Sequence, residues 1–164
     1  MYYQFFTDKD IPDISGEDYK ELIHWCFNNS TYFSLIYKEK AKEIKTLEKY
    51  KVSSFYTHSW PESPYCSDGG IMCIYFTDME AEKVLSNYVS GLFEWESVFG
   101  GENPEDLAFY RKDKSLLFSS IIHEGECYLY TRPPECVNQI IKKKGWMALD
   151  VDDFDTSKLS RHYF

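Results

Sequence analysis

The sequence predicts a single α+β domain in which a mainly antiparallel sheet, with a meander in its C-terminal half, packs against three to four helices. Three observations favour this class. Helical and strand-like patterns are mixed along the chain, the clearest strand neighbours are joined by tight turns, and 164 residues with 43% hydrophobic side chains suffice for one core. We expect residues 1–164 to form one domain and residues 150–164 to form a tail that is at most partly ordered.

Two helices are predicted by amphipathic spacing and by their ends. Residues 15–29 place Tyr19, Leu22, Ile23 and Cys26 three or four positions apart, with Ser15 as the N-cap. A second helix starts at a capping box formed by Thr77 and Glu80 and ends near Gly91. A weaker helix is expected over residues 39–50, and a last one begins at Pro133 and Pro134.

Strands are predicted where aromatic and β-branched residues gather between turn residues. Three strands are expected in the first half of the chain, at residues 31–37, 51–60 and 71–76. Three more form the meander, at residues 107–111, 115–123 and 127–131. Strict alternation along residues 115–123 places Leu117, Ser119, Ile121 and His123 on one face, and because both faces are largely apolar we expect this strand to be central.

Composition bounds the partners and the compartment. With 27 acidic against 18 basic residues the formal charge is −9, which disfavours nucleic-acid binding and favours a basic protein partner. The five cysteines are odd in number and contain no C-x-x-C pair, so we expect free thiols in a reducing cytoplasm. Neither a leader nor a long apolar stretch is evident, and no membrane association is expected.

No catalytic, cofactor-binding or metal-binding set is predicted. The histidines His24, His58, His123 and His162 are dispersed, and the chain has neither a nucleophile elbow nor a phosphate-binding glycine pattern. His123 and Glu124 are adjacent, and in one strand their side chains would leave opposite faces. They nevertheless mark the position of a pocket in an alternative interpretation, with His58 as a further contributor.

An acidic, aromatic loop is the best candidate for a contact surface. We predict partner binding by seven residues, because aromatic anchors surrounded by charge are typical of protein interfaces. They are Phe93, Glu94, Trp95, Glu96, Glu102, Glu105 and Asp106. The alternative is that Trp95 and Phe99 pack beneath the loop while its carboxylates are only solvated.

Several short motifs resemble those of a known family. These are Trp60-Pro61, the strand and helix over residues 71–89, G-L-F-x-W from Gly91, P-E-D-L from Pro104, and S-x-x-H-E from Ser120. Together they resemble a family of small uncharacterised bacterial proteins, some of which carry the name stage III sporulation protein AH. The resemblance covers residues 22–135 and supplies no catalytic residues.

Three functions follow from these observations. The leading hypothesis is a non-enzymatic cytoplasmic protein of bacterial or phage type that binds a basic protein, as an immunity protein or an inhibitor does. The alternatives are a small enzyme or small-ligand binder with its pocket near His123 and Glu124, and a sporulation-associated structural protein. The sequence does not determine the oligomeric state.

Overall fold

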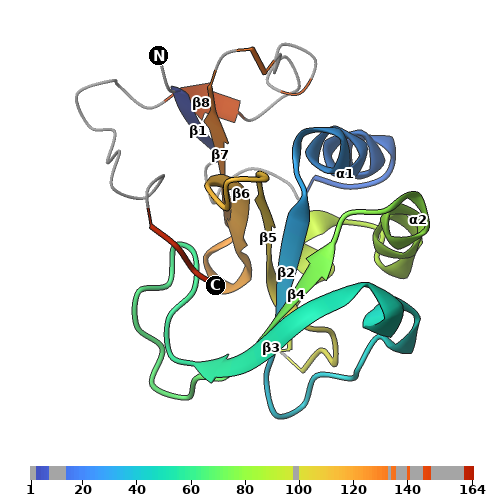
Figure 1. Cartoon of the computed structure of the whole chain (residues 1–164), viewed down its shortest axis with the longest axis vertical. Helices are drawn as coiled ribbons and strands as arrows, with labels where there is room; N and C mark the ends of the chain where they lie inside the picture. The colour runs from blue at the N-terminus through green and yellow to red at the C-terminus, as the bar shows by residue number, and fades with distance from the viewer. Residues whose placement is uncertain are drawn as a thin grey trace.

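In the part of the chain that the structure describes, one antiparallel sheet carries the α-helices α1 and α2 on one face (Figure 1). The computed structural model describes residues 3–7, 14–97, 100–132, 134–135, 140, 146–148 and 161–164. The strands are β1 (Tyr3–Thr7), β2 (Tyr32–Tyr37), β3 (Lys51–Thr57), β4 (Gly70–Phe76), β5 (Glu105–Tyr110), β6 (Leu116–Ile121), β7 (Glu126–Thr131) and β8 (Trp146–Ala148). The helices are α1 (Glu17–Asn29) and α2 (Met79–Tyr88), with 3₁₀ turns η1 (Lys45–Tyr50), η2 (Leu92–Glu94) and η3 (Ile122–Glu124).

The sheet order is β3-β4-β2-β5-β6-β7-β1-β8, and every neighbouring pair is antiparallel. The predicted fold class is therefore confirmed, and so is the meander β5-β6-β7. All six residues of β6 are buried, as expected for a central strand. The strands β1 and β8 were not predicted, and they extend the sheet beyond β7.

The two predicted α-helices are present, but their N-caps differ from the prediction. Gly16 precedes α1 without a side-chain cap, so Ser15 is not the N-cap. Asp78 caps α2 by accepting a hydrogen bond from the Glu80 N–H, whereas the Thr77 hydroxyl donates to the Ser30 carbonyl. The carboxylate of Asp78 replaces the predicted capping box because it reaches the exposed N–H groups of the first turn.

Residues 39–50 do not form the predicted helix. Only Lys45–Tyr50 is helical, as the 3₁₀ turn η1. Ile44 and Leu47 are the buried residues here, and this single three-residue spacing anchors one turn rather than a longer amphipathic face. The helix predicted from Pro133 onward falls largely outside the described residues.

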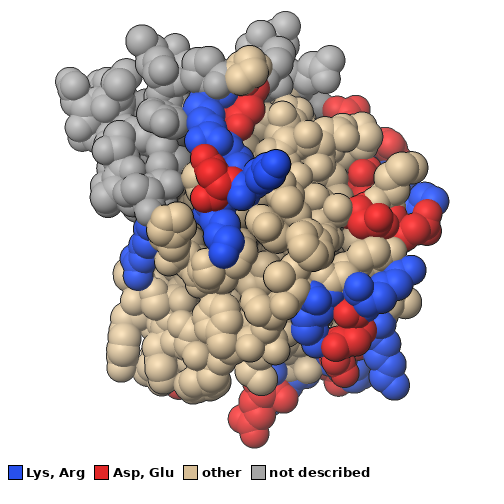
Figure 2. All heavy atoms as spheres, in the orientation of Figure 1, with Lys and Arg blue, Asp and Glu red and all other residues tan. Residues whose placement is uncertain are grey.

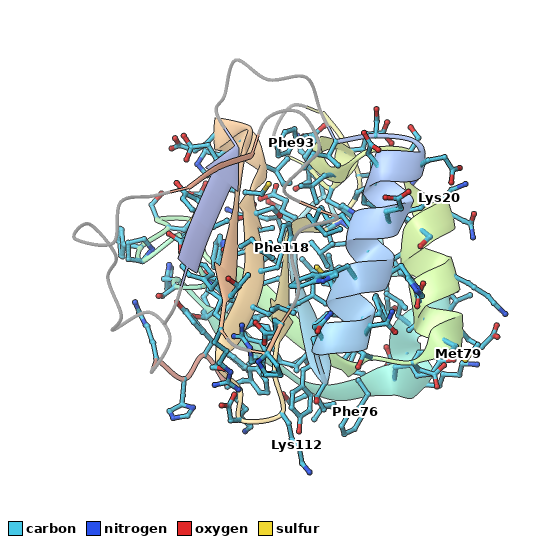
Figure 3. All side chains as sticks on the ribbon, turned by 90° about the horizontal axis from the view of Figure 1, so that it is seen from above. Lys20, Phe76, Met79, Phe93, Lys112 and Phe118 are labelled. Carbon is cyan, nitrogen blue, oxygen red and sulfur yellow. The ribbon has the colours of Figure 1, made fainter. Side chains whose placement is uncertain are left out.

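A bulge in β6 overturns the predicted alternation. Phe109 pairs with Phe118 and Tyr110 pairs with Leu116, so Leu117 is an extra residue on β6. Leu117 and Phe118 consequently both pack in the helix-side core, although they are consecutive. Figure 3 shows Phe118 in this layer, between the sheet and α1.

The opposite face of the sheet has its own smaller core. It contains Ile36, Trp60, Met72, Ile74, Ala108, Tyr110, Leu116 and Tyr130. The loop over residues 58–69 contributes Trp60 and Cys66 to this face, and the last two residues of the chain pack there as well. The Phe164 ring lies 5.1 Å from the ring of Tyr110, so this end of the predicted tail is in contact with the sheet.

Candidate functional site

A polar cleft lies where three strand ends meet. Neighbouring antiparallel strands run in opposite directions. The end of β2, the start of β5 and the end of β6 therefore lie side by side, at the same end of their strands. The loop over residues 58–69 closes the space beyond them into a cleft of about 520 Å³. Its polar and aromatic lining consists of Lys38, Trp60, Glu62, Ser63, Tyr65, Cys66, Glu105, Asp106, His123 and Glu124. We call it the strand-end cleft.

Asp106 forms the floor of the strand-end cleft. It has a left-handed φ of 51°, within a register shift between β2 and β5 that bends the start of β5. Aspartate tolerates this conformation better than most residues. Its carboxylate accepts hydrogen bonds from the Trp60 indole at 2.6 Å and from the Ile122 main-chain N–H at 3.0 Å. Burial raises the pKa of Asp106 to about 6, although these two hydrogen bonds act in the opposite direction.

Glu105 is also buried, but it serves a different segment. Its carboxylate accepts hydrogen bonds from the Ser97 hydroxyl at 2.5 Å and from the Ser97 N–H at 3.2 Å. Glu105 therefore ties the loop before β5 to the strand, while Asp106 ties the strand to Trp60. The local bend of β5 allows two consecutive carboxylates to be buried with separate donors.

Glu62 lies at the rim, in a turn that normally requires glycine. Trp60 and Ser63 exchange two main-chain hydrogen bonds around Pro61 and Glu62, and Glu62 has a φ of 62°. Proline followed by a residue of positive φ is typical of a type II turn, in which the second position favours glycine. Glutamate occupies this position here, and its carboxylate accepts a hydrogen bond from the Tyr130 hydroxyl. Of three non-glycine residues with positive φ in the described chain, two thus line this cleft.

Lys38 is the one lysine among the described residues that line the cleft. Its ammonium lies 3.0 Å from the Cys66 sulfur and 5.3 Å from the centre of the Trp60 ring. Partial burial by itself would lower the pKa of Lys38, but Cys66 and the nearby carboxylates of Glu105 and Asp68 raise it above its usual value. The ammonium group of Lys38 is therefore charged, and it is already in contact with Cys66 and Trp60 of the same protein.

His123 and Glu124 do not belong to a strand. They lie in η3, which follows β6, and the His123 Nε2 is 3.6 Å from a carboxylate oxygen of Glu124. The expectation that they leave opposite faces of one strand is wrong, because the tight turn brings both side chains to the same end of β6. Both are about half exposed and both line the strand-end cleft.

The structure separates the seven residues of the predicted contact loop. Trp95, Glu105 and Asp106 are buried, and the Trp95 indole donates to the Tyr19 hydroxyl. Glu94 is exposed, but its carboxylate accepts hydrogen bonds from the N–H and hydroxyl of Ser90. The remaining members are Phe93, Glu96 and Glu102, of which Glu102 is paired with Lys42. Partner binding by the loop stays a prediction, whereas the three buried residues are not presented at the surface.

A larger hollow of about 970 Å³ lies between α1 and α2. Its histidine is already paired: His24 Nδ1 is 2.8 Å from a Glu82 oxygen, and Nε2 is 3.0 Å from the Asn28 amide. The hollow is open and lined mostly by surface residues of α1 and α2, with no buried carboxylate among its described lining residues. The strand-end cleft is thus the better candidate.

Several residues of the cleft were not singled out from the sequence as site residues. They are Lys38, Trp60, Glu62 and Cys66, which lie far from the acidic loop along the chain. The short motifs that resemble the bacterial family did contain residues of this cleft. Trp60 from W-P, Asp106 from P-E-D-L and His123 from S-x-x-H-E all meet at the cleft, and the Ser120 hydroxyl donates to the Leu107 carbonyl beside it.

Comparison of the chain with protein-family models, with curated proteins and with solved structures finds no match. The resemblance to the bacterial family therefore stays a prediction. Within the described residues, no helix is long and apolar enough to cross a bilayer. The same part of the chain contains no group of three histidine, cysteine or acidic side chains with the geometry of a metal site.

Chemically, the cleft combines negative charge with aromatic surface. Among the described lining residues four are acidic and one is a lysine, and the rings of Trp60 and Tyr65 add apolar area. Carboxylates in a partly enclosed site attract a cation more strongly than they do in water, because the local dielectric constant is lower. The arrangement suits a positively charged group with an apolar stem.

Proposed function

We propose that this protein is a non-enzymatic binding module that captures a basic partner protein at the strand-end cleft, as an inhibitor or an immunity protein does. The observation that carries the proposal is that four acidic residues line one cleft, and that one of them, Glu124, keeps its carboxylate exposed at the mouth; the four are Glu62, Glu105, Asp106 and Glu124. Bacterial origin and a cytoplasmic location belong to the same proposal. It keeps the basic partner expected from the charge of −9 and moves the contact from the acidic loop to the cleft.

Charge supports this proposal both during the approach of a partner and at the contact itself. Far from the surface, a protein of charge −9 attracts a basic partner and raises the rate of encounter. At contact, Lys38, the one lysine among the described lining residues, already contacts Cys66 and the Trp60 ring. The carboxylate of Glu124 at the mouth lies beside His123 but is about half exposed, so an arginine or lysine from outside can reach it.

A row of aromatic side chains extends the surface beside the cleft. The rings of Tyr56 and His58 are 5.2 Å apart, and those of His58 and Tyr65 are 6.2 Å apart and nearly parallel. Tyr65 is 77% exposed and also lines the cleft. Exposed tyrosines next to acidic residues are typical of binding hot spots, because the rings bury a large area with little loss of conformational freedom.

The test uses a hexa-arginine peptide as the probe and two double variants of equal net charge. Glu62→Gln with Glu124→Gln changes the cleft, and Glu96→Gln with Glu102→Gln changes the acidic loop. Peptide binding is followed by titration calorimetry and by the NMR signal of the Trp60 indole. We expect the cleft variant to weaken binding at least tenfold and the loop variant to leave it within twofold.

The two variants remove the same charge, so an equal loss in both would mean unspecific attraction and would refute the cleft as the site. Preferential loss in the loop variant would restore the acidic loop as the contact surface. A wild-type protein that does not bind the peptide even at low salt would overturn the proposal altogether.

A second candidate function is a small enzyme or small-ligand binder that uses the same cleft. The contact between Cys66 and Lys38 favours it, because an ammonium group 3.0 Å from a thiol is an arrangement that assists nucleophilic cysteines. The rate of alkylation of Cys66 by iodoacetamide distinguishes the two functions. If the protein is an enzyme of this kind, Cys66 should be alkylated much faster than a free thiol, and Lys38→Met should slow the reaction. A binding module requires neither the fast alkylation nor its dependence on Lys38.

A further inference from the structure

The strand β3 is the outermost strand on one side of the sheet, and its outer edge is open. It pairs with β4 on one side, and among the described residues no strand pairs with its other side (Figure 1). Residues 52–56 are all exposed. An open edge presents unpaired main-chain N–H and C=O groups, which form a ready template for another strand.

The usual protections of an edge strand are confined to the start of β3. It contains no proline, and its only charged residue, Lys51, stands at its start, where Val52 bulges out of the register with β4. From Ser53 to Thr57 the pairing with β4 is regular and the side chains are uncharged. In Figure 2 the charged side chains gather toward the start of β3, while its second half crosses an uncharged area.

We propose that a second copy of this chain binds to β3 edge to edge, with the two β3 strands antiparallel about a two-fold axis at Phe55. In this register Phe55 faces Phe55 of the second copy, and Ser53 faces Thr57 of the second copy. Aromatic pairs and hydroxyl pairs are both favourable across antiparallel strands. The contact uses the same surface on both molecules, so it closes as a dimer.

Charge allows a second copy at this place, whereas it opposes one elsewhere on the surface. Two molecules of charge −9 repel each other over most surfaces, but residues 53–57 bring no like charges together. The regular stretch is also self-complementary, since Ser54 then lies opposite Tyr56 of the second copy. Tyr56 is held in position, because its hydroxyl donates a hydrogen bond to the Asp68 carbonyl.

The dimer is expected to be weak. About five paired residues from each molecule, with neighbouring rings, form a contact smaller than the roughly 20–30 residues per partner of a standard interface. We therefore expect dissociation constants in the range of tens to hundreds of micromolar, on the order of −5 to −6 kcal/mol. Sedimentation velocity between about 1 and 500 µM covers this range.

The test compares Phe55→Lys with Phe76→Lys. Phe76 is a matched control, because it is also a half-exposed phenylalanine of this sheet, 47% exposed against 36% for Phe55, but lies on β4 (Figure 3). We expect the wild type and the Phe76 variant to dimerise at high concentration. Phe55→Lys sets two ammonium groups against each other at the axis and should raise the dissociation constant at least tenfold. Circular dichroism confirms that each variant is folded.

A cross-linking experiment completes the test, because it detects the dimer directly and does not depend on the lysine variants. Under mild oxidation or with a short bifunctional thiol reagent, Phe55→Cys should form a cross-linked dimer and Phe76→Cys should not. A wild type that stays monomeric at about 500 µM would overturn the proposal. A dimer that Phe55→Lys leaves intact, or that cross-links through position 76 instead, would also overturn it.

Discussion

Asp106 should make the stability of this protein depend on pH in an unusual direction. Its carboxyl group is 3% exposed, and burial raises its pKa from 3.8 to about 6. In the unfolded chain the same group titrates near its ordinary value. Between these two pH values the folded state keeps a proton that the unfolded state has released, so the free energy of unfolding falls as the pH rises.

The magnitude follows from the two pKa values. A gap of about two pH units corresponds to about 3 kcal/mol, because one pH unit is worth about 1.4 kcal/mol. This stabilising contribution is fully present below about pH 4 and is lost as the pH rises through about 6. Asp106→Asn removes the titrating group and keeps a side chain that tolerates the positive φ of this position.

The assay is urea unfolding of the wild type and Asp106→Asn between pH 4 and 8, at low micromolar concentration because the isoelectric point is 4.9. We expect the wild-type free energy of unfolding, relative to the variant, to fall by about 2.5 kcal/mol between pH 4 and 8, because a small part of the change lies below pH 4. In parallel, the NMR signal of the Trp60 indole proton should shift with an inflection near pH 6, because this proton is bound to the Asp106 carboxylate.

A second acid of the chain provides the control. Asp113 is exposed, and although slight desolvation acts to raise its pKa, hydrogen bonds from Ser115 and the nearby Arg132 guanidinium lower this pKa to about 2. Asp113→Asn should therefore leave the pH dependence unchanged above pH 5. If the difference between wild type and Asp106→Asn is constant across the range, Asp106 does not titrate where burial predicts and the account of the cleft floor is wrong.

Two further predictions concern residues outside the cleft. Arg111 donates hydrogen bonds to both carboxylate oxygens of Glu135 and to two main-chain carbonyl groups, so Arg111→Met should lower the free energy of unfolding by about 3–5 kcal/mol in urea titrations. A loss below about 1 kcal/mol would show that this buried pair is not structural. Gly125→Ala should cost about 1–2 kcal/mol, because φ is 67° with open space around it, whereas Gly101→Ala should cost more, because its Cβ would lie 2.2 Å from a main-chain oxygen. Thermal melts of the two variants would contradict this if their order were reversed.

Local patterns were enough to predict most of the elements. The spacing of apolar residues in α1 and the clusters of aromatic and β-branched residues in β2 and β4 act within a few residues, so they are readable without tertiary contacts. The meander was predictable for the same reason, because tight turns join its strands. The strands β1 and β8 were not predictable in this way, because β1 pairs with β7 at the other end of the chain.

The candidate site was predicted only in fragments. Glu105 and Asp106 were placed together on an acidic surface because they are adjacent, but the bend at the start of β5 buries both and gives them different donors. Trp60 lies 46 positions from Asp106, and no local pattern connects them. The positive φ values of Glu62 and Asp106 are equally invisible in a sequence that shows no glycine there.

The sequence by itself determined the fold class, the acidic character and the positions of most helices and strands, because these depend on composition and on interactions between near neighbours. Only the tertiary structure decided which side chains meet: Asp106 and Glu124 come to one cleft because antiparallel neighbours bring their ends together, and the loop over residues 58–69 adds Glu62. It also decided which strand is left open, because the edge position of β3 follows from the pairing of all the others.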